Sequence, residues 1–198
     1  MLYEIAHVLR DRFPFLWDAV DGLNGWLFAL CYGQKLKGVH GKLGEFCPQE
    51  YDVILMKDCP TEELVAFFSR QPEEAFTYFR PHGFDAKSLH KLQQNRAFLG
   101  YVLKEKNSGR IAGYCFNRSF FHGKGFRGRM VDVDFRGRGL GTRMNRLLNE
   151  VGFGIGLKLF ETVSKHNVAS YRSALSASKV RILEEMEGDD LFLEILPD

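Results

Sequence analysis

The sequence predicts an α+β fold, a mixed α/β sheet preceded by an N-terminal helical appendage. Up to residue 50 the apolar side chains recur at helical spacing, and from residue 51 onward β-prone runs alternate with helical ones. Near residue 130 an apolar run ends in glycines, and a helical pattern follows directly. The predicted order after the appendage is β α α β β β α β α β β, and the predicted units are 1–50 and 51–198.

The N-terminal appendage is predicted to contain two helices. The first covers residues 2–13 and is ended or kinked by Pro14. The second carries apolar residues from Leu16 to Leu30 and dissolves in the basic, glycine-containing turn 33–38. We expect the appendage to pack on the core or on a second copy of the chain, as a homodimer. A lid over the acceptor and an interfacial membrane helix are the alternatives.

The first strand is predicted at Tyr51, Val53 and Leu55, where apolar residues alternate. An aromatic-rich segment, 63–80, follows and is divided by Pro72 into two helices. The remaining elements before the glycines are a short helix and a three-strand meander, predicted at 86–94, 97–104, 111–121 and 126–135.

A helix is predicted from Leu140, because the apolar residues at 140, 144, 147 and 148 form one stripe. It fades at the glycines of 152–156. The strand 158–163 follows, then a helix that Asn167 opens as N-cap. The chain ends in a hairpin whose strands are predicted at 180–186 and 191–196.

The composition suits one chain with a single sizeable core. Of the 198 residues, 45% are hydrophobic and 14% aromatic. The formal net charge is only +2, but residues 118–147 carry eight Lys or Arg and two acidic residues. This focused charge favours a polyphosphate ligand over a long nucleic-acid track, so we expect no nucleic-acid partner.

No metal site or membrane span is apparent in the sequence. The four cysteines show no C-x-x-C spacing and the six histidines no ligand pattern, so we expect reduced cysteines, no metal and a cytoplasmic protein. The longest uncharged run near the N-terminus, 22–33, is far shorter than the roughly 20 residues that span a bilayer, so we expect no stable membrane insertion.

Residues 130–144 read as a strand, a sharp turn and a helix start, and the turn is suited to binding an anion. Glycines at 137, 139 and 141 let several backbone N–H groups converge, and the first helical turn adds its unpaired donors and positive dipole end. A P-loop is excluded because Gly139-Leu140-Gly141-Thr142 contains no lysine. A Rossmann turn is excluded because the glycines do not follow G-x-G-x-x-G.

The remaining interpretation is a family resemblance. Arg136-x-x-Gly139-x-Gly141 resembles the acetyl-CoA signature Q/R-x-x-G-x-G/A of the GNAT superfamily of N-acetyltransferases. The preceding Val131-Asp132-Val133-Asp134-Phe135 is similar to the family's V-x-P-x-Y, with valine replacing proline. Asn167-x-x-Ser170 is similar to its N-x-x-A/S. The resemblance covers roughly residues 50–198 and implies a mostly antiparallel sheet that is splayed at the acetyl-CoA site.

The resemblance implies an N-acetyltransferase that moves an acetyl group from acetyl-CoA to the primary amine of a small molecule, with an amino sugar as first guess. Protein N-termini, amino acids and polyamines are other acceptors in this superfamily. The residues expected to bind acetyl-CoA are Val131, Val133, Arg136, Gly137, Arg138, Gly139, Leu140, Gly141, Thr142, Asn167 and Ser170. His82, Phe84 and Phe79 are the candidate acceptor contacts.

The catalytic groups are less well defined by sequence. Many family members carry a tyrosine seven residues after the asparagine, but position 174 here is alanine, which leaves Tyr171 as the nearby phenol that would protonate the leaving thiolate. Water, Ser170 or Ser173 are the alternatives. Asp132, Glu161, His122 and water are candidates for the base. A non-catalytic CoA-binding or interaction module with the same fold is the competing function, and nucleic-acid binding is a third.

Overall fold

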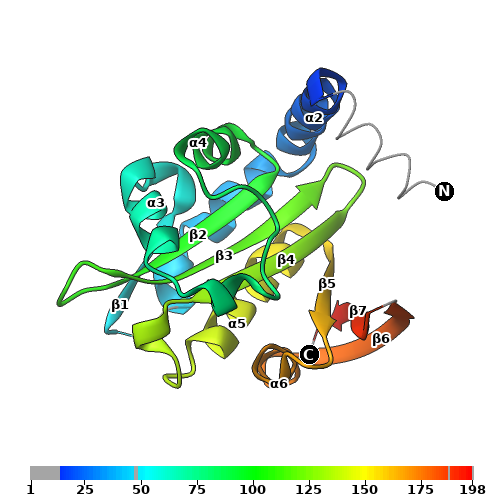
Figure 1. Cartoon of the computed structure of the whole chain (residues 1–198). Helices are drawn as coiled ribbons and strands as arrows, with labels where there is room; N and C mark the ends of the chain where they lie inside the picture. Colours follow the sequence, from blue (N-terminus) through cyan, green and yellow to red (C-terminus); the bar gives the residue numbers. More distant parts are fainter. Residues whose placement is uncertain (1–13, 47–48, 187, 198) are drawn as a thin grey trace.

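The computed structural model describes residues 14–46, 49–186 and 188–197, so the helix expected over 2–13 lies outside the described residues. Figure 1 shows a twisted sheet with helices on both faces. The helices are α2 (Pro14–His40), α3 (Thr61–Ser69), α4 (Ala86–Gln94), α5 (Leu140–Ile155) and α6 (Val168–Leu175). The strands are β1 (Tyr51–Leu55), β2 (Phe98–Glu105), β3 (Ile111–Phe120), β4 (Lys124–Val131), β5 (Lys158–Ser164), β6 (Lys179–Met186) and β7 (Asp190–Leu196).

The seven strands form one sheet in the order β1-β2-β3-β4-β5-β7-β6. Every neighbouring pair is antiparallel except β4 and β5, which run parallel because α5 connects them. Only three residue pairs join β4 to β5, and the last is Phe126 with Phe160. Beyond that pair the two strands separate, as Figure 1 shows to the right of β4. The mostly antiparallel, splayed sheet predicted from sequence is therefore confirmed.

Two hydrophobic clusters hold the layers together. One face of the sheet packs on α2 and α5, and the predicted stripe of α5 is buried there, with Met144 and Leu148 fully inaccessible. The other face packs on α3 and α4 through an aromatic cluster that includes Phe67, Phe68 and Tyr114. Because both faces are covered, β2 and β3 read as nearly continuous apolar runs rather than as alternating ones.

The prediction that the second N-terminal helix dissolves at residues 33–38 is wrong, because α2 continues to His40. Glycine costs about 1 kcal/mol relative to alanine inside a helix. Here Tyr32, Leu36 and Val39 lie one turn apart and pack against the core. The His40 imidazole also hydrogen-bonds the Tyr101 hydroxyl at 2.9 Å. This packing outweighs the local preference of the glycines.

Two further boundaries differ from the sequence prediction. The segment after Pro72 forms a single 3₁₀ turn, η3 (Glu73–Phe76), instead of a second helix. The third meander strand ends at Val131, and a 3₁₀ turn, η4 (Val133–Phe135), replaces its predicted last residues. Asp132 caps η4 by accepting a hydrogen bond from the Asp134 backbone N–H at 3.0 Å. This cap competes with strand continuation, as aspartate side chains commonly do.

Helix α2 belongs to the core of the molecule. Phe28 is fully buried in the same cluster as α5, and the Asn24 side chain bonds both the Ser119 carbonyl and the Phe121 N–H at the end of β3. The opposite side of α2 leaves Leu16, Val20, Leu23 and Leu30 exposed. Among the described residues, no helix combines the length and apolar character that crossing a membrane requires.

Replacing Phe28 by alanine tests the attachment of α2. The side chain is 0% exposed, so Phe28→Ala should lower the free energy of unfolding by about 3–5 kcal/mol in urea denaturation. Leu30→Ala, on the same helix but 65% exposed, is the control and should change it by about 0.5 kcal/mol or less. Equal, small effects would show that α2 does not unfold together with the sheet.

Candidate functional site

A cleft of about 480 Å³ opens where β4 and β5 separate. Its walls come from five segments that are distant in sequence: β4, β5, the glycine turn with the start of α5, one side of α6, and the region of η3. The strand separation creates the space, and α5 and α6 close it from behind. A cleft of this size, with polar groups placed on several elements, has the form of a small-molecule site.

The glycine turn points the start of α5 at one end of this cleft. Gly137 and Gly139 have φ values of +76° and +74°, a conformation that other residues adopt only with strain. The first backbone bond of the helix runs from the Arg143 N–H to the Gly139 carbonyl. The N–H groups of residues 140–142 therefore have no partner within α5 and, with the helix dipole behind them, are suited to an anion.

Most of the residues expected to bind acetyl-CoA line the cleft, namely Val131, Arg136, Gly137, Gly139, Leu140, Gly141, Thr142, Asn167 and Ser170. Val133 and Arg138 do not. Val133 lies in η4 and is 38% exposed. Arg138 turns toward the β2–β3 hairpin, where its guanidinium lies over the Phe135 ring and meets Glu105 at 3.5 Å. Arg138 therefore contributes to holding the turn.

Asn167 opens α6 as the sequence predicts. Its side-chain oxygen accepts a hydrogen bond from the Ser170 N–H at 3.2 Å, so the cap fixes where the helix starts. With that start, Asn167, Ser170 and Ser173 lie at intervals of three residues and face the cleft. Tyr171 follows Ser170 by about 100° around the helix. It packs instead against the core cluster beside α5, and it is not among the cleft-lining residues.

Glu161 reaches the cleft, but two arginines hold its carboxylate. Oxygen Oε2 accepts hydrogen bonds from Arg127 Nε at 2.5 Å and Arg129 Nη1 at 3.3 Å. All three side chains are buried, with exposed fractions of 3%, 0% and 8%. Because both guanidinium groups bond Oε2, this carboxylate positions Arg127 and Arg129, and these contacts do not support the proton-acceptor role considered from sequence.

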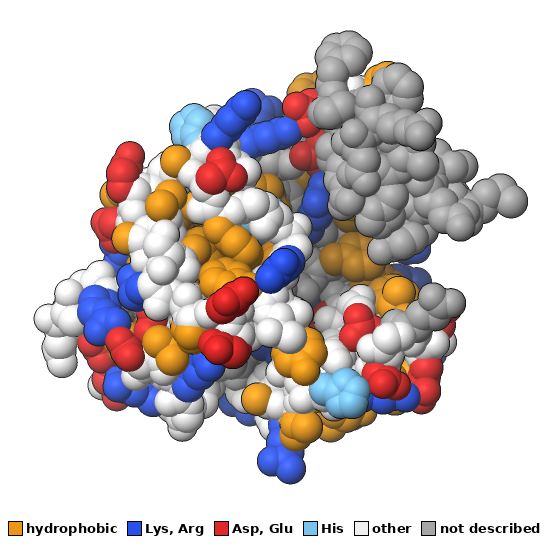
Figure 2. Space-filling view, in the orientation of Figure 1, with side chains coloured by type: hydrophobic (Ala, Val, Ile, Leu, Met, Phe, Trp, Pro, Cys, Tyr) orange, Lys and Arg blue, Asp and Glu red, His pale blue; other side chains and the backbone are white. Residues whose placement is uncertain are grey.

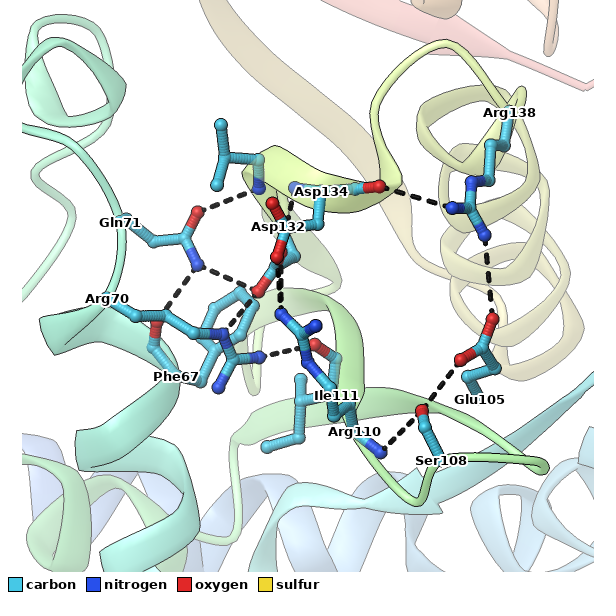
Figure 3. A network of polar contacts seen from close by, with 11 residues as sticks. Phe67, Arg70, Gln71, Glu105, Ser108, Arg110, Ile111, Asp132, Asp134 and Arg138 are labelled. Atoms are coloured by element: carbon cyan, nitrogen blue, oxygen red, sulfur yellow. Dashed lines mark hydrogen bonds and ion pairs between the residues drawn. The ribbon is translucent and has the colours of Figure 1, made fainter.

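Asp132 is not among the cleft-lining residues. It lies at the turn after β4, where Figure 3 shows its contacts with Arg70 and Gln71. Its buried carboxylate accepts hydrogen bonds from Arg70 at 2.6 Å and from Gln71 at 3.0 Å, both at the end of α3. Burial acts to raise the pKa of Asp132, but the bonds from the Asp134 N–H, Arg70 and Gln71 outweigh it and hold the pKa below its usual value. This arrangement stabilises the carboxylate form and leaves it poorly suited to accept a proton.

These contacts of Asp132 with Arg70 and Gln71, here called the Asp132 clamp, extend to the backbone of the turn. The Gln71 side chain donates to Asp132 and accepts from the Val133 N–H at 3.1 Å. On the solvent side of the turn, Arg110 donates a hydrogen bond to the Asp134 carboxylate at 2.6 Å. Ser108 and Glu105 bond each other and extend the network along the β2–β3 hairpin (Figure 3). The end of α3 and the exit of β4 are therefore fixed to each other.

The acceptor contacts expected from sequence divide into two groups. Phe79 lines the cleft, together with Glu74, Ala75 and Tyr78. His82 and Phe84 lie in the aromatic cluster under α3, and His82 bonds the buried Tyr114 hydroxyl at 3.0 Å. Burial lowers the pKa of His82, so it is neutral at physiological pH. His122, the remaining candidate base, stacks on Phe120 and is also absent from the cleft lining.

Sequence reasoning missed Glu74 and Arg129 as cleft residues, whereas Ser173, which also lines the cleft, was already an alternative to Tyr171 as proton donor. A local signal existed only for Glu74, because Pro72 followed by two acidic residues marks a turn within the segment expected to form the acceptor floor. Arg129 follows Gly128 in a predicted strand. The alternation of polar and apolar residues along that strand would by itself place the Arg129 side chain on the solvent-exposed face. Its burial depends on Glu161, which is 32 residues away.

Comparison with known proteins identifies the architecture. No family model and no curated protein sequence matches the chain. Among solved structures, the GNAT domain of S. lividans PAT aligns with a TM-score of 0.62 at 16% identity, over 72% of this chain and 88% of that one. The chain has the GNAT fold. At this level of identity the comparison establishes the fold alone.

Two other neighbours with this fold are named for different acceptors. Ribosomal-protein-S5-alanine acetyltransferase from Vibrio fischeri aligns with a TM-score of 0.60 at 15% identity, over 75% of this chain and 93% of that one. Aminoglycoside acetyltransferase AAC(6')-Ib, solved with coenzyme A and kanamycin, aligns with a TM-score of 0.54 at 14% identity, over 73% and 93%. The GNAT fold therefore does not by itself indicate the acceptor.

Four of the eight basic residues of 118–147 form ion pairs with acidic residues of the same chain. Arg118 pairs with Asp21, Arg127 and Arg129 with Glu161, and Arg138 with Glu105. On the face seen in Figure 2, Lys and Arg are interspersed with Asp and Glu instead of forming one basic field. This distribution does not favour a nucleic-acid track.

The Asp132 clamp predicts a pH-dependent stability. At pH 7, Asp132→Asn should lower the free energy of unfolding by about 1.5–3 kcal/mol, because hydrogen bonds to a charged group are lost. The pKa of Asp132 is lowered in the fold, so this stabilisation is fully present above the unfolded value of about 3.9 and is lost as the pH falls further.

Urea denaturation of both proteins between pH 7 and pH 3 measures this difference. The difference in the free energy of unfolding between wild type and Asp132→Asn should stay constant down to about pH 4 and become smaller below it. Asp134→Asn is the control, because Asp134 is 59% exposed and pairs only at the surface, and it should cost less than about 1 kcal/mol. A gap that widens in acid would contradict the assigned clamp.

Proposed function

We propose that the protein is an acetyl-CoA-dependent N-acyltransferase that acts on the primary amine of a small molecule. The observation that carries this proposal is the cleft between β4 and β5, which leads directly to the open first turn of α5. Acetyl-CoA carries a pyrophosphate and a long pantetheine chain. It therefore needs an anion site for the pyrophosphate and an extended groove for the pantetheine chain.

The donor fits this geometry in a definite direction. The backbone N–H groups of residues 137–142 hold the pyrophosphate at the glycine end. The pantetheine arm lies along β4, where the strand has no partner on the β5 side beyond Phe126 and can pair its backbone with the amides of the arm. The acyl end then comes to lie near the apex of the cleft, beside residues 127–129. The bound coenzyme A of the AAC(6')-Ib neighbour supports this assignment.

The acceptor enters from the side of η3. Glu74 and Tyr78 are exposed there and line the cleft with Phe79. The Glu74 carboxylate attracts a cationic amine and takes its proton, directly or through water, so that the free amine attacks the thioester. Tyr78 and Phe79 offer ring faces to the rest of the acceptor. An amino sugar fits this combination of one carboxylate and two rings, and the kanamycin of the AAC(6')-Ib neighbour supports that class.

Replacing Gly141 tests the donor site. Gly141 lines the cleft at the first turn of α5, and its added Cβ would meet Ser173 only at an ordinary 3.6 Å, so Gly141→Val should fold normally. The valine methyl groups obstruct the approach of phosphate to the N–H groups, and CoA affinity measured by calorimetry should fall at least about tenfold. Gly38→Val, at an open helical glycine of α2, is the matched control. Unchanged affinity in Gly141→Val would remove the phosphate site from this turn.

Replacing Glu74 tests the acceptor site. Glu74→Gln should lower kcat/KM for the amine by roughly 10²-fold, as expected for a lost proton acceptor, and leave the KM for acetyl-CoA nearly unchanged. Glu73→Gln changes the adjacent carboxylate, which does not line the cleft, and serves as the control. The acceptor itself is sought by acetylation of a panel of amino sugars, amino acids and polyamines. A protein that binds acetyl-CoA but acetylates none of them would favour the non-catalytic module.

A further inference from the structure

Acyl transfer from a thioester releases a sulfur anion, and the cleft must accommodate that charge. The amine nitrogen forms a bond to the carbonyl carbon, the C–S bond breaks, and its electron pair leaves on sulfur. A thiolate is a basic leaving group, so a hydrogen-bond donor or a cation beside the sulfur lowers the barrier to this step. The question is which of the described residues supplies it.

Arg129 has the required position. Its side chain projects from β4 into the wall of the cleft and is only 8% exposed. Its Nη2 donates to the Ser170 carbonyl at 2.8 Å, the Ser170 hydroxyl at 3.0 Å and the Ser173 hydroxyl at 2.6 Å. Ser173 in turn donates to the Ser170 carbonyl at 2.9 Å. These contacts hold the guanidinium between β4 and α6, in the wall of the cleft along which the proposed pantetheine arm runs.

The charge around Arg129 is not fully compensated. Arg129 and Arg127 share Glu161, so the buried group contains two cations and one anion. The positive ends of the α5 and α6 dipoles add to the same field, because both helices begin at the cleft. A negative charge that develops on sulfur in this cleft is therefore stabilised.

The other candidates are less well placed. The phenol of Tyr171 packs against the core, and Ala174 is fully buried and carries no proton donor. Arg127 is 0% exposed and is used by Glu161 and Asn149. Arg136 belongs to the glycine turn, at the phosphate end of the cleft. Tyr78 lies on the acceptor side, in the region of η3.

We propose that Arg129, oriented by Glu161, Ser170 and Ser173, stabilises the departing thiolate of CoA and takes the place of a phenolic acid in this step. The inference rests on the proposed function, because it requires CoA in the cleft. The guanidinium acts through its charge and its N–H groups, and it gives up no proton in this step. The sulfur departs as a thiolate paired with Arg129, and it takes a proton from solvent when CoA is released.

The direct test uses bound CoA and does not depend on turnover. The thiolate of CoA absorbs in the ultraviolet, so titrating the protein–CoA complex gives the pKa of the bound thiol. With wild-type protein this pKa should be about 1 unit or more below that of free CoA, and in Arg129→Met the lowering should disappear. Arg129→Met should still fold, because Glu161 keeps its partner Arg127.

Two controls separate the possible outcomes. Arg136→Met should weaken CoA binding at the phosphate end and leave the pKa of the bound thiol lowered, and Arg129→Lys should restore part of the lowering. If CoA does not bind the wild-type protein, the proposed function fails. If CoA binds and its thiol has the same pKa in wild type and Arg129→Met, this inference alone is overturned.

Kinetics give an independent check. Arg129→Met should lower kcat roughly 10²-fold, as for a lost transition-state donor, and should change the KM for acetyl-CoA by less than about threefold. Because arginine does not titrate below about pH 12, kcat in the wild type should show no fall between pH 9 and pH 10.5. A fall in that range, abolished by Tyr171→Phe or Tyr78→Phe, would assign the step to a phenol and contradict the proposal.

Discussion

The buried contact of Arg127 and Arg129 with Glu161 occupies the point where β4 and β5 separate. Up to Phe126 and Phe160 the two strands pair through their backbones. At the next position on each strand the side chains are charged, and they meet one another and Asn149 of α5. Removing Glu161 would be costly, typically about 3–5 kcal/mol for a buried charge left unpaired, because both arginines would lose this counter-ion. The contact therefore joins β4, β5 and α5 at the point where the two strands separate.

The other features of the cleft follow from that separation. Because β5 diverges, β4 keeps a free backbone edge facing the gap, and α5 and α6 approach the gap with their N-terminal ends. The glycine turn and the Asn167 cap set the first residues of these two helices. A shift of either start by one or two residues would turn different side chains toward the cleft. Because α6 starts directly after Asn167, the side chains of Ser170 and Ser173 face the cleft and that of Tyr171 does not.

Local patterns predicted the parts of the fold that depend on neighbours in sequence. The stripe of α5, the turn at Gly137 and Gly139, and the Asn167 cap all involve residues within a few positions of each other. The continuation of α2 through its glycines depended on packing against β2 and the core, which no local preference contains. The roles of Asp132 and Glu161 were equally inaccessible, because their partners Arg70 and Arg127 are 62 and 34 residues away.

The clamp between α3 and the exit of β4 also bears on how two substrates would meet. Arg70 and Gln71 end the helix that leads into η3, and Asp132 and Val133 begin the turn that leads into α5. One buried carboxylate thus joins the η3 side of the cleft to its glycine turn. Two molecules bound at these two places would meet at a spacing that the contacts of Asp132 help to fix. Pre-set spacing of this kind turns an encounter of two reactants into a nearly unimolecular event, and its entropic cost is met when the chain folds.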